Sequence, residues 1–518
     1  MKNSTKLIHI NEPELLFANN QTALDPRDGL LLYGPYQPLR PYSVMAGVVS
    51  TNNGLNLYRK FVNKLNKPIY STKTIYGTTK SDEISRPSFP GFEAVFNIKW
   101  NSKEQIHCEI SETEISTIIK ERNKKIRINR LVSLYLNEIK RVENSEDVDI
   151  NIWFIIVPKN LYVNARPKSK GIDDISKGTK DYIEKNKKGQ TTLEFEGHND
   201  YDDMVSQLRS SKNNFHHLLK ARLIQEKIRA PIQIFVEPTL EFKDKMSLKK
   251  YDKNLKAHIA WTQSTSLFYK LGKLPWKLNG IREGVCYVGL VFKKFEGKEI
   301  ACSAAQMFLD DGDGSVFRGN IGLWGSKSKY EYHLDEKSSE ELLGMALDDY
   351  KQKIGKYPKE LFLHGRAYFD SEEWNGFESA IKKRNASTHL TGVIIKQYYD
   401  LKLFRDVENE SSNYGILRGT ALIINDKEGY LFTNGYVPRL QTATSLEVPN
   451  PLKVNIYRGD VDIKIVLSDI MALTKLNYNA CIFADGLPVT LKFSDNIGNI
   501  LTATDNWKTE KRQFKYYI

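Results

Sequence analysis

Apolar residues along this 518-residue chain fall into short runs bounded by turn residues and into longer segments of helical spacing. The short runs predict strands at 30–36, 151–157 and 232–236. Apolar residues three and four positions apart predict helices at 55–65, 214–229 and 255–271. Because strands and helices alternate here, the pattern predicts an α/β unit with a parallel sheet.

Strands dominate the pattern after residue 284. Apolar runs at 284–294 and 301–309, with a hairpin continuing through 319–325, predict a three-strand meander. A helix at 338–354 and a strand at 360–364 complete the order of elements of the RNase H fold. Further strands are predicted at 388–396, 419–425 and 428–436, and further helices at 371–382 and 461–474.

The composition excludes several classes of protein. Apolar residues make up 40% of the chain, and its four cysteines form no C-x-x-C pair, so we expect neither disorder, a disulfide scaffold nor a cysteine-rich zinc site. The longest run of apolar residues and glycine, 284–292, is far shorter than the ~20 residues of a membrane helix. We therefore expect a soluble, cytoplasmic protein with no membrane contact.

Positive charge is in excess, with 76 Lys and Arg against 63 Asp and Glu, a formal net charge of +13. This excess favours a polyanionic partner such as nucleic acid, or it only solubilises the surface. The run 120–130 (KERNKKIRINR) holds six cations and forms either part of a nucleic-acid channel or a solvated helix face. Segment 166–213 is polar and poor in large apolar residues, so we expect a mobile surface insertion there.

Four polar residues of the first half could together bind a terminal phosphate. His216 and Lys220 are four positions apart on a predicted helix and so share one face. Gln233 lies in the next predicted strand, and Lys270 closes the helix at 255–271. One imidazole, two ammonium groups and one amide are suitable donors for a phosphate. Structural explanations stay open, since Lys270 would favour the helix dipole and His216 could be a partly buried helix residue.

This combination resembles the MID domain of Argonaute proteins, where an H-x-x-x-K helix, a strand glutamine and a lysine before L-G-K-L-P-W bind the 5′-phosphate of a guide. The segments GVCYVGLVF, ELFLHGRAYFDSEEW and LTKLNYNACIFADGLPVTLKFSDNIG are similar to the PIWI domain. GLLLYGPY and RPSFPGFEAVF are similar to short prokaryotic Argonautes, so the resemblance spans essentially the whole chain. It implies a Rossmann-like MID domain with an N-terminal segment in 1–265 and an RNase H-like PIWI domain in 266–518. We expect no separate N-terminal and PAZ domains, because the length leaves no room for them.

The resemblance also implies that the nuclease site is inactive. PIWI nucleases hold two metal ions with carboxylates at strand ends. Here Val291 and Arg366 stand where the family has its first two aspartates, and only Asp495 keeps an acidic position. A cation beside a metal site is unfavourable, by roughly 4 kcal/mol per charge pair at ~4 Å in an effective dielectric constant of about 20. The alternative is an unusual metal site that uses Asp310, Asp313 or Asp370.

The chain ends in the apolar and aromatic sequence FKYYI, so we expect a buried C-terminal segment. In Argonautes the terminal carboxylate reaches the MID pocket, where Mg²⁺ bridges it to guide phosphates. The resemblance implies this role for Ile518 and Mg²⁺ as the cofactor. A final edge strand packed on the core is the simpler explanation.

The resemblance is closest to short Argonautes that act with a TIR-APAZ protein. It implies a 5′-phosphorylated guide RNA and a complementary single-stranded DNA target, with sequence recognised by base pairing. It also implies a heterodimer with a TIR-APAZ NADase, which would form a higher oligomer on activation in prokaryotic defence against plasmids and phage. The alternatives are a sirtuin-like or nuclease partner, a guided endonuclease with a rearranged metal site, and a DNA-binding protein without a guide.

Overall fold

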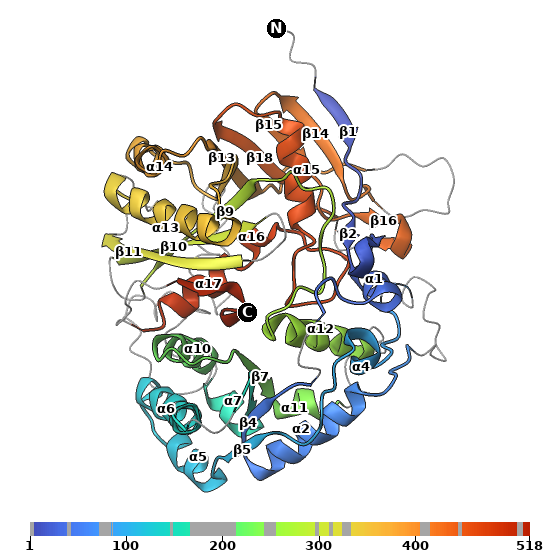
Figure 1. Ribbon diagram of the computed structural model, residues 1–518, viewed down its shortest axis with the longest axis vertical. Helices are drawn as coiled ribbons and strands as arrows, with labels where there is room; N and C mark the ends of the chain where they lie inside the picture. The colour runs from blue at the N-terminus through green and yellow to red at the C-terminus, as the bar shows by residue number, and fades with distance from the viewer. Residues whose placement is uncertain are drawn as a thin grey trace, which may run out of the picture.

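A computed structural model places the two predicted units in separate halves of the molecule (Figure 1). The described residues are 5–38, 43–71, 84, 86–145, 149–165, 214–242, 255–295, 300–309, 314–323, 333–404, 415–443, 448–504 and 511–518. The expected insertion at 166–213 and the residues Asp310 and Asp313 lie outside them.

One half is built on a four-stranded, fully parallel sheet in the order β5-β4-β6-β7. Its strands are β4 (Ala46–Ser50), β5 (Ile106–Glu109), β6 (Ile152–Val157) and β7 (Ile232–Val236). On one side of this sheet lie α5 (Glu112–Ile119), α6 (Lys124–Glu143) and α10 (Phe215–Gln225), and on the other α2 (Asn52–Leu65) and α11 (Glu237–Leu240) (Figure 1). Short helices α4 (Phe92–Phe96) and α7 (Lys159–Ala165) and the longer α12 (Leu255–Lys270) complete this Rossmann-like unit.

The other half is built on a ten-stranded mixed sheet in the order β1-β14-β15-β18-β13-β12-β9-β10-β11-β19. Its central strands are β9 (Val285–Lys294), β10 (Ile300–Leu309), β11 (Gly314–Leu323), β12 (Glu360–Gly365) and β13 (His389–Gln397). Three of them form the expected antiparallel meander, and β12 then pairs with β9 in parallel, which is the RNase H arrangement. The outer strands are β1 (Lys6–His9), β14 (Thr420–Asn425), β15 (Glu428–Leu431), β18 (Leu452–Arg458) and β19 (Lys511–Gln513).

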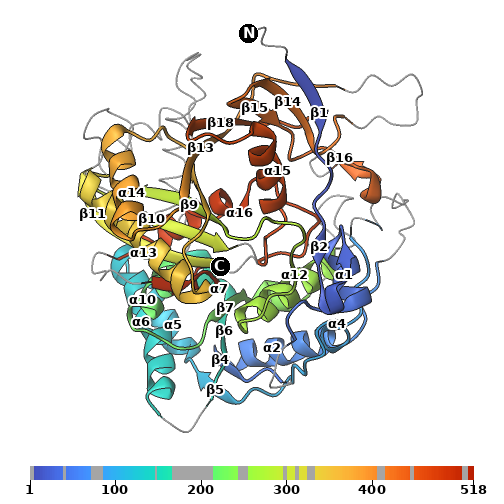
Figure 2. The same ribbon diagram turned by 45° about the horizontal axis from the view of Figure 1, so that its top comes forward.

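Helices cover both faces of this larger sheet. α13 (Glu336–Ile354) and α14 (Ser371–Lys383) enclose a second apolar core with alternate residues of β9, including Val288 and Leu290. α16 (Val489–Lys492) and α17 (Ser494–Leu501) pack on the opposite face of β9. α15 (Ile463–Leu473) lies against β15 (Figure 2). A Cβ atom at Gly289 would lie 2.0 Å from the Thr490 oxygen, so only glycine allows this close approach of α16 to β9.

Most predicted elements are confirmed, but one is wrong. Residues 30–33 of the strand predicted at 30–36 instead form the C-terminal part of helix α1 (Pro26–Tyr33), which ends before Gly34. Asp25 caps this helix by accepting from the Arg27 N–H, Pro26 occupies a first-turn position, and the buried Asp25 carboxylate also pairs with the Arg27 side chain at 2.6 Å. Capping chemistry therefore overrides the apolar run LLLY, which has the length of a strand.

Two predicted boundaries also differ. α10 ends at Gln225 rather than at 229, because Lys227 adopts a left-handed backbone with φ of 56°. The strand predicted at 428–436 ends at Leu431, and Tyr436–Val437 forms a separate short strand, β16, paired with β17 (Thr442–Ala443). Strands β10 (Ile300–Leu309) and β11 (Gly314–Leu323) pair in antiparallel fashion, with Phe308 opposite Gly314.

The N-terminal segment crosses between the two halves. β1 adds an edge strand to the ten-stranded sheet, and β2 (Leu15–Leu16) pairs with β3 (Thr22–Ala23) and β8 (Lys277–Leu278). The Glu12 carboxylate joins two cations of the C-terminal half, Arg418 at 3.0 Å and Lys475 at 2.8 Å. Among the described helices none is long and apolar enough to cross a membrane.

Candidate functional site

The C-terminus lies near the middle of the molecule, where the two halves meet (Figure 1), and Lys220 of α10 contacts it. The Lys220 Nζ donates to the main-chain oxygens of Ile518 at 2.7 Å and Tyr517 at 3.2 Å. Lys220, Tyr517 and Ile518 are all buried. The expectation of a buried C-terminal segment is thus confirmed. The chain also ends in an edge strand, β19, of the ten-stranded sheet, as the simpler explanation of the apolar C-terminal sequence expected.

The second lysine of the predicted pocket meets the predicted glutamine. Lys270 is the last residue of α12, is buried, and donates from Nζ to Gln233 Oε1 at 2.5 Å. Gln233 lies in β7 and donates from Nε2 to Gln263 Oε1 at 3.2 Å; Gln263 lies about two helical turns before Lys270 in α12. Gln263 thereby fixes the amide of Gln233 so that its oxygen faces the ammonium of Lys270.

Burial and mutual repulsion disfavour the positive charge of this cluster. Burial lowers the pKa of Lys220 to about 7. It also lowers the pKa of Lys270 well below its usual range, and Lys220 adds a repulsive contribution. The pKa of His216 is lowered well below its usual value by burial and by the charges of Lys220, His217 and Lys270. No acidic side chain of the described chain contributes to these shifts, so the cluster favours an anion that would restore the charged lysines.

Sequence reasoning missed three residues of this cluster. Gln263 gave no signal, because a polar residue on a mixed helix face is ordinary. Asn496 donates from Nδ2 to the Tyr517 oxygen at 3.0 Å. Through this hydrogen bond α17, a helix of the half built on the larger sheet, holds the C-terminal segment in place. His217, whose Nδ1 is buried without a hydrogen-bond partner, has its pKa lowered to about 4, chiefly by burial. The doublet His216-His217 was the only sequence sign of it.

Two of the three predicted nuclease positions, Arg366 and Asp495, come together. Val291 is buried in β9 on the face that α17 covers. His364 of β12 lies opposite Gly289 of β9, two residues before Val291, and Arg366 directly follows the end of β12 at Gly365. The Arg366 Nη1 lies 3.6 Å from Asp495 Oδ2, and its Nη2 donates to the Leu491 oxygen at 3.3 Å. Both members of this ion pair are exposed, with 49% and 64% of their side-chain surfaces accessible.

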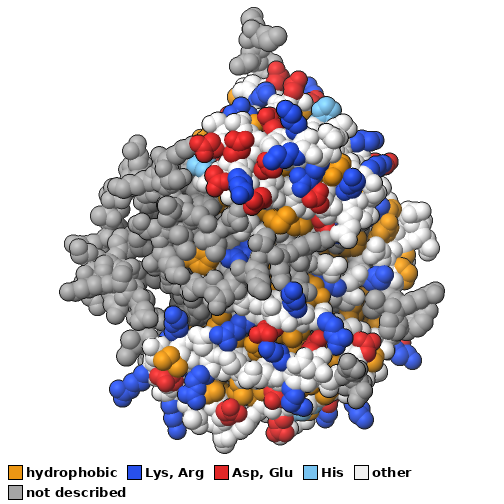
Figure 3. Space-filling model, turned by 60° about the vertical axis from the view of Figure 1, so that its left-hand side comes forward, with side chains coloured by type: hydrophobic (Ala, Val, Ile, Leu, Met, Phe, Trp, Pro, Cys, Tyr) orange, Lys and Arg blue, Asp and Glu red, His pale blue; other side chains and the backbone are white. Residues whose placement is uncertain are grey.

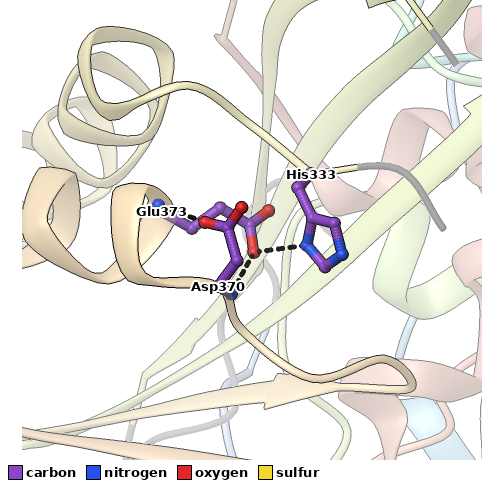
Figure 4. Close-up of side chains that lie close together, drawn as sticks. All are labelled: His333, Asp370 and Glu373. Carbon is purple, nitrogen blue, oxygen red and sulfur yellow. Dashed lines mark hydrogen bonds and ion pairs between the residues drawn. The ribbon is translucent and has the colours of Figure 1, made fainter. Parts of the chain in front are cut away.

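His333, Asp370 and Glu373 form a separate cluster whose geometry is explained by folding (Figure 4). Asp370 and Glu373 make the reciprocal capping box of α14, with hydrogen bonds of 2.8 and 3.2 Å. Glu373 also accepts from the Leu334 N–H at 2.8 Å and contacts His333 Nδ1 at 3.0 Å. Since the oxygens of Glu373 already have these partners, the cluster anchors the start of α14, and it gives no support to a metal site at Asp370.

The basic run 120–130 is neither wholly a solvated helix face nor wholly a surface open to nucleic acid, because two of its six cations are buried. Lys124 and Arg127 are buried, and Arg127 donates to the Glu121 oxygen at 2.9 Å, so these two cations hold the start of α6. Lys120, Arg122, Lys125 and Arg130 are exposed. On the face shown in Figure 3, basic and acidic side chains are interspersed among the described residues. The positive charges on this face therefore do not form one large patch among those residues.

Comparisons with known proteins give a structural match and no sequence match. No protein-family model and no curated protein matches the chain. It is similar to the structure of Clostridium butyricum Argonaute bound to a guide DNA and a 19-mer target DNA, with a TM-score of 0.59 and 16% identity over 96% of this chain and 53% of that one. It is also similar to Aquifex aeolicus Argonaute, in one structure with externally bound siRNA, with a TM-score of 0.55 and 15% identity over 99% of this chain and 56% of that one.

These matches show an Argonaute-like fold with the MID–PIWI arrangement of a Rossmann-like unit and an RNase H-like unit. The chain spans about half the length of the structures that it matches. The predicted fold class, α/β with these two units in this order, is confirmed.

Proposed function

We propose that this chain binds the 5′-phosphate of a guide strand in the pocket of His216, Lys220, Gln233 and Lys270. The observation that carries the proposal is the burial of two lysines that have no acidic side chain as a partner in the described chain. A phosphate dianion would supply the missing negative charge and accept hydrogen bonds from both ammonium groups and from an amide. The Argonaute-like fold supports a guide as the source of that phosphate, because a matched structure holds a guide DNA.

Mg²⁺ is the cofactor that we propose for this pocket. The protein oxygens beside Lys220 are the main-chain oxygens of Tyr517 and Ile518, a small set for a cation that prefers six oxygen ligands. The residues therefore fit Mg²⁺ only when guide phosphates complete its coordination. Bound in this way, the ion would neutralise phosphate charge, while Lys220 and Lys270 hold the terminal phosphate.

The proposed guide is RNA, and the proposed target is complementary single-stranded DNA. We propose no cleavage of that target by this chain. Val291 offers no ligand to a metal, and Arg366 places a cation beside Asp495, so the described site lacks the carboxylate pair that two-metal hydrolysis requires. Binding is then the output of this chain, and a partner supplies the chemistry.

The partner that we propose is a TIR-APAZ protein in a heterodimer. Target pairing would activate NAD⁺ hydrolysis by that protein through a higher oligomer, in prokaryotic defence against plasmids and phage. This part rests on the resemblance to short Argonautes alone. Co-expression of the two chains, with NAD⁺ consumption measured before and after addition of guide and target, tests it. Hydrolysis that does not depend on a complementary target would contradict it.

The pocket itself is tested by comparing the affinities of a short RNA with a 5′-phosphate and with a 5′-hydroxyl. We expect the wild-type chain to prefer the phosphate, and each of Lys220→Ala and Lys270→Ala to weaken phosphate binding by about 10- to 100-fold, the worth of a charged hydrogen bond. Lys60→Ala, at an exposed lysine of α2, is the matched control. Equal affinities for the two RNAs in the wild-type chain would reject the pocket.

A further inference from the structure

Two exposed tyrosines, Tyr368 and Tyr457, lie side by side close to the end of β12. Tyr368 is 50% exposed in the loop between β12 and α14, two residues after Arg366. Tyr457 is 37% exposed in β18. Their ring centroids are 5.2 Å apart and the rings are tilted by 57°, so they form one small aromatic surface.

The fold holds both rings in place. Phe369, next to Tyr368, is buried against Phe377 and Tyr457, and Asp370 caps α14, so the loop is fixed on both sides of its exposed ring. In the pairing of β13 with β18, Gly392 lies opposite Arg458 and Val393 opposite Ile456, which leaves Tyr457 as the extra residue of a β-bulge. Bulges redirect side chains, and here Tyr457 and Arg458 are both exposed although they are neighbours in a strand.

Two cations flank the rings. The Lys396 Nζ lies 5.3 Å from the centroid of Tyr368, and the Arg458 guanidinium lies 5.5 Å from the centroid of Tyr457. Both side chains are exposed, and neither has an ion-pair partner within the described ranges. Arg366, two residues before Tyr368 in the chain, is instead paired with Asp495.

We propose that Tyr368, Tyr457, Lys396 and Arg458 form a stacking surface for single-stranded nucleic acid. Exposed aromatic faces bind bases of any sequence, and cations beside them bind the phosphates, which is the combination that sequence-tolerant single-strand sites use. The charge of the surface is complementary to a polyanion and unsuited to a basic protein partner. If the proposed function is correct, this surface holds the target strand where it passes the degenerate nuclease site.

The test is independent of a guide. The affinity of guide-free protein for a fluorescent oligothymidylate with a 5′-hydroxyl is measured by anisotropy. We expect Tyr368→Ala and Tyr457→Ala each to weaken binding by about 5- to 100-fold, as expected for the loss of one stacked base, and Tyr368→Phe and Tyr457→Phe to keep wild-type affinity. Tyr70→Ala, at a tyrosine that is 72% exposed in the other half, is the control.

The cations have their own readout. Lys396→Gln and Arg458→Gln should each reduce the salt dependence of oligothymidylate binding by about one phosphate contact.

Unchanged affinity in both tyrosine-to-alanine variants, or affinity as weak in the phenylalanine variants as in the alanine variants, would overturn the stacking surface. Loss of TIR-APAZ binding with unchanged DNA binding would assign the surface to a protein instead and also overturn it. Wild-type affinity for a 5′-phosphorylated guide in the tyrosine variants separates this outcome from failure of the phosphate pocket.

Discussion

The Lys220 Nζ lies 2.7 Å from the main-chain oxygen of Ile518, although the two residues are 298 positions apart. Lys220 belongs to the four-stranded parallel unit, whereas Ile518 follows the last strand of the ten-stranded sheet. The proposed phosphate pocket therefore lies where the two halves meet. A ligand bound there contacts both halves, so its binding can stabilise their arrangement.

The first prediction concerns the pH dependence of guide binding. Burial lowers the pKa of Lys220 to about 7, and a bound phosphate would raise it, so binding at higher pH requires proton uptake. The affinity for a 5′-phosphorylated RNA should fall by about 10- to 50-fold between pH 7 and 9, where the phosphate charge is nearly constant. Calorimetry in buffers of different ionisation enthalpy measures the protons taken up, and a 5′-hydroxyl RNA is the control. No proton uptake over this range would contradict the assignment.

The second prediction concerns the stability of the free protein. The folded pKa of Lys220 lies below its unfolded value, so the folded state binds fewer protons between about pH 7 and 10.5, and wild-type stability gains with rising pH there. Lys220→Met removes this titration, so its Tm minus that of the wild type should decrease as pH rises from 7 to 10. Thermal melts over that range measure it, with Lys60→Met as the exposed control. A difference that does not vary with pH would mean that Lys220 is ordinarily charged when folded.

Local patterns predicted most of the fold because its strands and helices are formed by nearby residues. The apolar run of β6 and the helical spacing of α2 and α12 are visible without any tertiary information. The strand predicted at 30–36 is wrong because apolar residues in a short segment fit a strand or a helix equally well. The helix is decided by the N-terminal cap at Asp25 and the pairing of Asp25 with Arg27, and both residues lie before the apolar run.

The candidate site was predictable where its residues lie in a spaced motif and not where they meet only in three dimensions. His216 and Lys220 share a helix face, so their proximity follows from the sequence. Asn496 reaches the Tyr517 oxygen, and Gln263 reaches Gln233, only because distant elements pack together. Likewise, the 3.6 Å pair of Arg366 with Asp495 depends on how α17 packs on β9.

The third prediction concerns the junction at Glu12. Burial alone would raise the pKa of Glu12, but the charges of Arg418 and Lys475 outweigh it and hold this pKa below its usual value. Glu12→Gln leaves two cations buried without their carboxylate, which should cost about 3–5 kcal/mol of unfolding free energy. Denaturant unfolding measures the loss. Asp28→Asn, which breaks the exposed pair with Arg439, is the control and should cost under ~1 kcal/mol; equal losses in the two variants would refute the importance of the buried charges.

The fourth prediction is that this chain does not cut its target. With guide RNA, complementary DNA and either Mg²⁺ or Mn²⁺, the labelled target should remain intact, because Val291 and Arg366 leave Asp495 without the acidic neighbours that hold two metal ions. Asp495→Ala should therefore leave both the intact target and guide affinity unchanged. A guided nuclease run in parallel verifies the conditions. Product that forms with the wild-type chain and disappears with Asp495→Ala would establish a rearranged metal site and reject the inactive assignment.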